Sequence, residues 1–584
     1  MKSNNEEDVI DPETGEVLPR EYKIPVKNFK REYLEVPEKF IKLIRSSLDK
    51  EPLFFKDTVN EIKFIADLYP AKRLLGGLGE WYRRNSPDQE SLIIIKLVNR
   101  NENLFEIFLE QEKEEEKIEG IFLGNQYNMV GGRKYEAEKK YYTPLSDLLT
   151  HVFICGITGS GKTVLGKIIV EEAALRAIPT IIIDLKGDLS SLGLIIRTSD
   201  DLKMWVKAKD EELKEFKVKE IYRKHYEKLI AFGITREKIE DFHNKIDFRV
   251  FTPRSKKGIQ LGFASPLGAP PYPIEMYKIN KEDFNSLVAS LTNAFMDRLY
   301  PGTKKTRIEN ERNYLFEIVH HAWLNGINLK GADGMMELLR LVEEPPFQEI
   351  GGLPVSQYID AENRRKRLLN KINTMLSGPE KMWFEGTPME INIFLKAESE
   401  KVPVNVINLT DLDNFEDRSF VVAQVAYEIN KWMRKYPSEE PQLIFFIDEI
   451  GGGGGKQALF PSFPYECAAK WGLNYLIRQG RAFGVCCILA TQNPGDVDYK
   501  GLSNCQTWMI GKLATDRDRK KVMEGMEVWG SDAERVKHNL TNAQTGDFVI
   551  KTPRGELNYI KERWLMSYHR VLSLADIEKI YINR

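Results

Sequence analysis

Cysteine is scarce in this sequence, at five of 584 residues. No two cysteines have the C-x-x-C spacing of a zinc site, and no pair of histidines lies near them, so we expect no zinc site. Cys155, Cys486 and Cys487 lie inside apolar runs, where cysteine acts as a small buried hydrophobe. This usage favours a reducing compartment, and we therefore expect a cytoplasmic protein.

The sequence also lacks an excess of charge and any long apolar segment. Its formal net charge is −2, so any contact with DNA would need a local basic patch or an assembled pore. No apolar stretch approaches the roughly 20 residues that cross a bilayer, so we expect no membrane association. The short basic runs are more typical of a solvated surface than of a DNA contact, and they occur at residues 254–257, 304–307, 364–367 and 517–521.

The remaining sequence changes its pattern several times along the chain. The N-terminal region is largely helical in its apolar spacing, at residues 33–48 and 59–68, with one clear hairpin at residues 91–109. A long, mostly helical stretch later interrupts a series of strands, which predicts a helical insertion into a sheet domain. The predicted segments are a flexible tail (1–20), a small mixed α/β domain (21–140), the first part of the core (141–262), the insertion (263–403), the second part of the core (404–554) and a C-terminal segment (555–584).

A strand, a glycine-rich turn, a helix and a second strand follow one another over residues 152–184. This order is typical of a βαβ unit, and so of a parallel sheet. Continuous rather than alternating apolar runs suit central strands that are covered on both faces. Such runs recur at residues 248–251, 404–408, 443–447, 485–490 and 508–511, and we predict an α/β fold.

The glycine-rich turn matches G-x-x-x-x-G-K-[ST], the phosphate-binding loop or P-loop. Its glycines allow backbone N–H groups to wrap a β-phosphate, and the helix that follows presents its positive N-terminus to the same group. A lysine here places its charge between the β- and γ-phosphates, and a threonine offers its hydroxyl to Mg²⁺. The predicted nucleotide-binding residues are Gly156, Thr158, Gly159, Ser160, Gly161, Lys162 and Thr163.

Asp448 and Glu449 end a second apolar strand. Because parallel strands deliver side chains at their carboxyl edge, we expect both residues beside the P-loop. Asp448 would complete the Mg²⁺ site with Thr163, and Glu449 would act as the general base towards water. Such a strand end is only moderately specific alone; together with the P-loop it predicts ATP hydrolysis.

Gln492 follows another apolar strand, where it could contact a γ-phosphate and sense hydrolysis. The alternative is a hydrogen-bonded turn before Pro494. Arg478 and Arg481 precede the same strand, and an arginine supplied by a neighbouring subunit would stabilise transition-state charge. The alternative is that both arginines are ordinary surface residues, and the residues alone leave this open.

Four segments together resemble the HerA/FtsK superfamily of P-loop ATPases, and most closely its HerA-like DNA translocases and helicases: residues 156–163, 183–188, 448–449 and 478–504. The resemblance implies a RecA-like P-loop NTPase core. It also implies a homo-hexameric ring with double-stranded DNA in the channel and ATP between subunits. It implies that Arg481 acts on the neighbouring site and that Asp184 and Lys186 belong to the nucleotide site.

The resemblance further implies a partner nuclease or an antiphage defence effector, and a C-terminal segment that braces the neighbouring subunit. The family often has a basic residue followed by a histidine just before the first strand, and here Thr150 stands before His151 in place of the basic residue. The usual N-terminal β-barrel is expected to be reduced or replaced. Five glycines at residues 451–455 are either a flexible connector or a mobile loop near the nucleotide or channel. We predict an ATP-dependent DNA translocase or helicase. An ATP-regulated scaffold for a partner effector and a conjugation or secretion ATPase remain alternatives.

Overall fold

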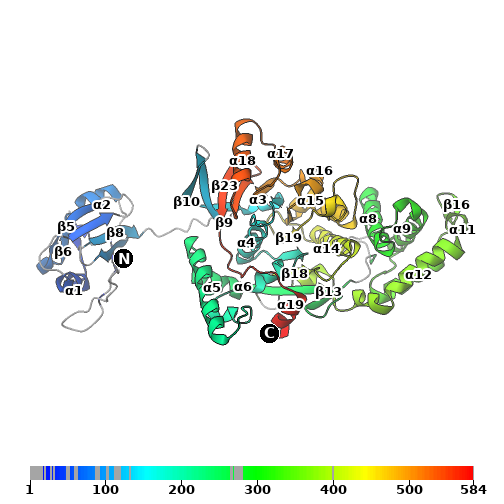
Figure 1. Ribbon diagram of the computed structural model, residues 1–584, viewed down its shortest axis with the longest axis horizontal. Coiled ribbons are helices and arrows are strands. Elements are labelled where there is room, and N and C mark those ends of the chain that lie inside the picture. Colours follow the sequence, from blue (N-terminus) through cyan, green and yellow to red (C-terminus); the bar gives the residue numbers. More distant parts are fainter. Residues whose placement is uncertain are drawn as a thin grey trace. The chain divides into compact units, whose positions relative to one another are not determined.

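The computed structural model divides the chain into two units, residues 1–118 and 119–584 (Figure 1). The residues that the structure describes are 18, 21–25, 29–30, 33–47, 53–57, 63–85, 92–99, 104–110, 120–130, 133–263, 267–268, 280–397 and 400–582. The predicted tail, residues 1–20, lies almost entirely outside them. No helix in these ranges is both long and apolar enough to span a membrane.

The first unit is built on one eight-stranded sheet, with strand order β1-β7-β8-β4-β5-β6-β3-β2. Its strands are β1 (Glu21–Pro25), β2 (Phe29–Lys30), β3 (Tyr33–Glu35), β4 (Leu53–Asp57), β5 (Lys63–Tyr69), β6 (Leu74–Gly76), β7 (Leu92–Asn99) and β8 (Leu104–Glu110), and its helices are α1 (Glu38–Ser47) and α2 (Gly79–Asn85). The rings of Phe55 and Phe105 stack in its core, and the ring of Phe40 packs edge-on against Phe105.

The prediction of a largely helical N-terminal region was wrong. Of the segment 59–68, which we predicted to be helical, residues 59–62 lie outside the described residues and the rest belongs to strand β5. In this strand Ile65 and Asp67 are exposed on either side of the buried Ala66. That alternation has the period of a half-buried strand. The hairpin prediction agrees with the structure, because β7 and β8 pair antiparallel.

The second unit is organised around a thirteen-stranded sheet with the order β10-β9-β23-β22-β21-β11-β20-β19-β12-β18-β13-β14-β17. Every pairing from β21 to β17 is parallel. This confirms the predicted α/β core. Its strands are β9 (Gly120–Val130), β10 (Arg133–Pro144), β11 (Val152–Cys155), β12 (Thr180–Asp184), β13 (Ile246–Pro253), β14 (Ile259–Gly262), β17 (Thr387–Pro388), β18 (Val402–Asn408), β19 (Leu443–Asp448), β20 (Val485–Thr491), β21 (Thr507–Ile510), β22 (Asp547–Lys551) and β23 (Leu557–Glu562).

Helices cover both faces of this sheet (Figure 1). Successive residues of a strand point to opposite faces, so Phe153 lies in one hydrophobic core and Ile154 in the other. This arrangement explains the continuous apolar runs. The helices outside the insertion are α3 (Leu145–Leu149), α4 (Lys162–Leu175), α5 (Glu211–Ala231), α6 (Arg236–Lys245), α14 (Phe415–Lys435), α15 (Ala468–Gln479), α16 (Tyr499–Leu502), α17 (Asp516–Gly525), α18 (Gly530–Asn542) and α19 (Leu574–Ile582).

The predicted helical insertion is present and has a hydrophobic core of its own, which includes Tyr314, Trp323 and Leu338 (green in Figure 1). Its elements are α8 (Lys281–Leu299), α9 (Glu309–Leu324), α10 (Gly331–Glu343), β15 (Glu349–Ile350), β16 (Leu353–Pro354), α11 (Val355–Tyr358), α12 (Lys366–Met375) and α13 (Ile391–Leu395). Strand β17 lies within the predicted insertion but pairs with β14, so the main sheet extends into this segment.

Two predicted boundaries need correction. Strands β9 and β10, which we assigned to the N-terminal domain, belong to the core sheet, so the first unit ends at Ile118 rather than at residue 140. The reason is that β9 pairs with β23, which lies near the other end of the sequence. The C-terminal segment likewise starts inside the sheet of its own chain, and its contact with a neighbouring subunit stays a prediction.

Candidate nucleotide-binding site

The P-loop joins β11 to α4 and is held by the strands on both sides of β11. The Gly156 amide donates to the Thr491 carbonyl (3.3 Å) and the Ile157 amide to the Lys512 carbonyl (2.9 Å). Gly159 and Gly161 have φ values of 79° and 101°, which disfavour residues with a Cβ atom. The sequence pattern therefore corresponds to a loop whose backbone requires glycine at these positions.

Lys162, Thr163 and Asp448 meet at the carboxyl edge of the sheet. The Lys162 ammonium pairs with Asp448 Oδ1, and Thr163 Oγ1 donates to Asp448 Oδ2 (2.7 Å). Burial lowers the pKa of Lys162 to about 8, while the Glu449 carboxylate opposes this shift. A hydroxyl and a carboxylate oxygen are the hard oxygen ligands that Mg²⁺ prefers, so this pair fits a metal ion bound through nucleotide phosphates.

Glu449 is held in one orientation by contacts on both carboxylate oxygens. Its Oε1 accepts from Thr491 Oγ1 (3.3 Å) and from the Gln492 amide (3.1 Å), and its Oε2 accepts from Lys186 Nζ (2.8 Å). Its φ is 73°, an unusual value for a residue with a side chain. The Glu449 and Ile450 amides both donate to the Ala490 carbonyl (2.9 and 2.8 Å), which stabilises this backbone. Strained backbone of this kind often occurs at functional sites.

Gln492 directly follows β20 and contacts the P-loop from that strand end. Its Oε1 accepts from Thr158 Oγ1 (2.7 Å), so it is positioned on the side of the loop that carries Glu449. The glycine run at residues 451–455 begins directly after this site. A Cβ at Gly451 would lie 2.5 Å from Thr491 Oγ1, and Gly453, Gly454 and Gly455 all have left-handed φ values.

The carboxylate of Asp184, which we expected to bind the nucleotide, instead faces the loop that follows β12. It is fully buried, and burial raises the pKa of its carboxyl. Its Oδ1 accepts from the Lys186 and Gly187 amides, and its Oδ2 from the amide and hydroxyl of Ser190. Asp184 therefore stabilises its own loop, and it is Lys186, presented by that loop, that reaches the site.

Arg481 lies far from the P-loop of its own chain. It is exposed and precedes β20, whereas the P-loop follows β11, and these strands run parallel. It lies beside His151, whose Nδ1 accepts from the Cys487 amide (3.1 Å) and whose pKa burial lowers to about 4. The described residues offer Arg481 no ion-pair partner.

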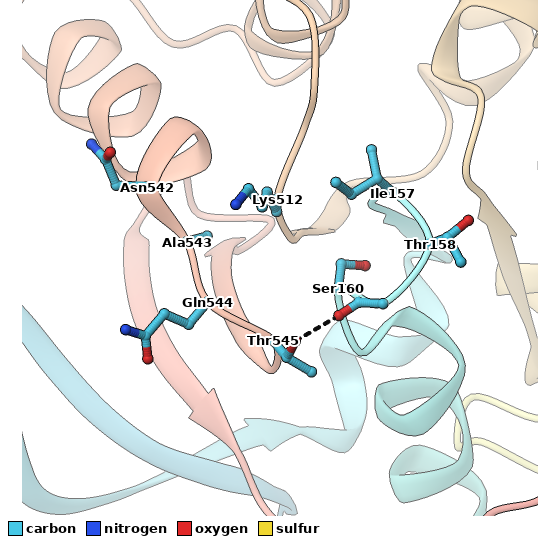
Figure 2. A pocket seen from close by; sticks show the side chains of 9 residues that line it. Ile157, Thr158, Ser160, Lys512, Asn542, Ala543, Gln544 and Thr545 are labelled. Atoms are coloured by element: carbon cyan, nitrogen blue, oxygen red, sulfur yellow. Dashed lines mark hydrogen bonds between the residues drawn. The ribbon is translucent and has the colours of Figure 1, made fainter.

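Several residues that hold the P-loop in place belong to no sequence motif, so they could not be predicted from the sequence. Thr545 Oγ1 donates to the Gly159 carbonyl (2.8 Å; dashed line in Figure 2), and the Gly546 amide donates to the Ser160 carbonyl (2.8 Å). The buried carboxylate of Glu562 lies where a side chain on Gly161 would have to go. Burial raises the pKa of this carboxyl well above its usual range.

The C-terminal segment also fixes the P-loop helix α4. Glu171 and Arg563 form an ion pair (2.9 Å), and neither side chain has any exposed area. Glu171 also accepts from the Met566 amide and from the amide and hydroxyl of Ser567. A cationic partner and three further donors satisfy this carboxylate, so the buried charge is tolerated.

A P-loop between the buried strand β11 and helix α4, with an Asp-Glu pair at the end of β19, one strand beyond the neighbouring β20, defines the chain as a P-loop ATPase. The family described as the central domain of helicase HerA matches residues 132–429, about half of the chain. The chain therefore belongs to the HerA helicase family.

The other similar proteins either match a short segment of this chain or match most of it at low sequence identity. The chain is 34% identical over 85 residues to a probable helicase of Methanocaldococcus jannaschii, which is 15% of this chain and 16% of that protein. Among solved structures, VirB4 of Thermoanaerobacter pseudethanolicus is similar at 13% identity and a TM-score of 0.45, over 76% of this chain and 97% of VirB4. The bacterial conjugative coupling protein TrwB is similar at 14% identity and a TM-score of 0.42, over 78% and 97%.

Proposed function

We propose that this ATPase couples ATP hydrolysis to movement along double-stranded DNA, as a homo-hexameric translocase or helicase. The observation that carries the proposal is the convergence of Lys162, Thr163, Asp448 and Glu449 at one edge of the sheet. Lys162 binds the phosphates, Thr163 and Asp448 hold Mg²⁺, and Glu449 takes a proton from the attacking water. Gln492 contacts the γ-phosphate in this proposal.

The position of Arg481 supports a ring. Strand β20 has seven residues, so its two ends lie about 20 Å apart at the usual rise per residue of a strand. Arg481 is therefore too far from its own P-loop to contact the γ-phosphate there. It can complete only the site of a neighbouring subunit, where its charge stabilises the transition state.

The proposal includes a partner protein and a cellular location. We include a partner nuclease or defence effector on the resemblance of residues 478–504 to HerA-like DNA translocases. All five cysteines are free and buried, which supports a reducing, cytoplasmic setting.

Phosphate release from ATP by the purified chain, with and without duplex DNA, tests the proposal. We expect hydrolysis that duplex DNA stimulates and that Lys162→Ala abolishes. The matched control is Lys520→Ala, which removes an exposed lysine of α17 outside the site. Hydrolysis indifferent to Lys162→Ala would refute the assigned site.

A triplex-displacement assay separates a motor from an ATP-regulated scaffold. A motor displaces a third strand from duplex DNA without any partner protein. Hydrolysis without displacement, together with ATP-dependent capture of a nuclease encoded beside it, would support the scaffold instead.

A further inference from the structure

Two of the basic runs in the sequence, residues 304–307 and 364–367, lie next to each other in the helical insertion. Tyr300 follows α8 and leads into the first run, and the guanidinium of Arg367 in the second run lies 5.7 Å from the centre of its ring. Arg367 also forms an ion pair with Glu311, in the first turn of α9, which begins shortly after the first run. The fold therefore joins two runs that are far apart in sequence into one surface.

We call this surface the basic face, and its exposed cations are Lys304, Lys305, Arg307, Arg364, Arg367 and Lys371. Among the residues that the structure describes, only Arg367 of these six pairs with a carboxylate. Lys371 instead lies over the ring of Tyr300, 5.5 Å from its centre. Cations on a solvated helix commonly pair with acids one turn away, as several lysines of α5 do. The basic face thus carries positive charge that the neighbouring described residues do not neutralise.

A cavity of about 520 Å³ runs along the part of the basic face that is formed by α12 and the π-helical turn before it, Ala361–Arg365 (Figure 1). All eight residues that line it are polar or charged, and four of them are cations against a single carboxylate, Glu362. The amides of Asn363 and Asn370 also line it. A π-helical turn inside a longer helix is frequent at functional sites. The cavity therefore offers a concave, cationic surface with neutral hydrogen-bond donors between the charges.

We propose that the basic face binds the phosphate backbone of double-stranded DNA, a proposal that rests on the proposed movement along duplex DNA. Arginine, lysine and asparagine side chains are usual donors to phosphate oxygens. Arg364, Arg367 and Lys371 recur at intervals of three and four residues, so they follow one side of the helix over about 10 Å. Each DNA strand carries one charge about every 3.4 Å along the duplex axis, so its backbone presents phosphates to all three cations.

The composition of the basic face favours DNA over an acidic protein as its partner. Interfaces between proteins have an apolar core, whereas interfaces with DNA are more polar and strongly positive. No apolar residue lines the cavity. The large exposed apolar side chains in the described part of the insertion, Met336 and Leu353, belong to α10 and β16. Because the expected contacts are to phosphates, binding should not depend on the base sequence.

Fluorescence anisotropy of a labelled DNA duplex with the full chain, at several salt concentrations, tests the proposal. The double variant Arg364→Ala/Lys371→Ala keeps Arg367, whose loss would leave the buried Glu311 without its partner. We expect its Kd to rise about tenfold at low salt. The slope of log Kd against log salt concentration should fall by about two, one for each lost phosphate contact.

A second double variant, Lys304→Ala/Arg307→Ala, should have the same effect, because both runs form one surface. The matched control is Lys217→Ala/Lys219→Ala, which removes two exposed lysines of α5 and so the same amount of charge. It should leave the Kd and the salt slope unchanged. All three variants should hydrolyse ATP at the wild-type rate without DNA, because none of these residues belongs to the nucleotide site.

Three results would overturn the basic face as a DNA-binding surface. The first is a wild-type Kd and salt slope in either double variant of the face. The second is an equal loss of binding in the α5 control, which would mean that only net charge matters. The third is displacement of the duplex by poly-glutamate at equal charge concentration, which would assign the face to acidic proteins. A wild-type chain that binds no duplex DNA would instead refute the proposed function.

Discussion

Replacing Arg481 with alanine should abolish hydrolysis, although this residue lies about 20 Å from the P-loop of its own chain by the length of β20. An arginine that stabilises the transition state of phosphoryl transfer contributes roughly 10³- to 10⁵-fold in rate. The assay is steady-state phosphate release. Arg478→Ala, an exposed arginine three positions away, is the control and should remain active.

Mixed rings show whether the arginine acts on a neighbour. In rings co-expressed from equal amounts of Lys162→Ala and Arg481→Ala subunits, half of the P-loops and half of the arginines are intact. Random assembly then leaves about a quarter of the sites complete, so we expect about a quarter of wild-type hydrolysis if the arginine acts in trans. Mixed rings as inactive as either variant alone would refute this reasoning, and so would full activity of Arg481→Ala.

Three further outcomes follow from the contacts described above. Asp448→Asn should lower kcat/KM by about 100-fold, because it removes the anionic ligand proposed for the metal. The measurement is hydrolysis at increasing Mg²⁺ concentrations. Recovery of hydrolysis at high Mg²⁺ would indicate weakened metal affinity alone, and full wild-type activity would contradict the assignment. Arg563→Met should lower the free energy of unfolding by about 3–5 kcal/mol in urea titrations, because it leaves the Glu171 carboxylate buried without its cationic partner. A loss below about 1 kcal/mol would show that the amide donors alone stabilise this carboxylate. Burial lowers the pKa of His151 to about 4, so as the pH falls the unfolded chain binds a proton at this histidine before the folded chain does, and the free energy of unfolding should fall from about pH 6.5 to pH 4. His151→Gln should flatten this dependence of stability on pH. An unchanged dependence would show that His151 does not contribute to it.

Short motifs made part of the site predictable. The spacing within residues 156–163 specifies a glycine-dependent loop and the start of α4, because local backbone geometry requires those residue types. Asp448 and Glu449 could be assigned to the same edge because parallel strands end together. Lys162 and Asp448 were thus expected to meet, and the structure brings them together.

Contacts between distant segments were not predictable in this way. Thr545 and Gly159 are 386 residues apart in sequence, and nothing in either segment indicates their hydrogen bond. Asp184 was assigned to the nucleotide site from the family resemblance alone. An acid at the end of a strand can face either a ligand or its own loop, and only the fold distinguishes the two. Strand β5 was mistaken for a helix because a short apolar run fits both periods.

Turnover by Glu449→Gln tests the central claim most directly. If Lys162, Asp448 and Glu449 surround one nucleotide, this variant should bind ATP within about twofold of wild type, because the change removes a general base and preserves the shape of the side chain. Its rate of hydrolysis should fall by at least about 100-fold, the usual contribution of such a base. Hydrolysis at the wild-type rate would contradict the account.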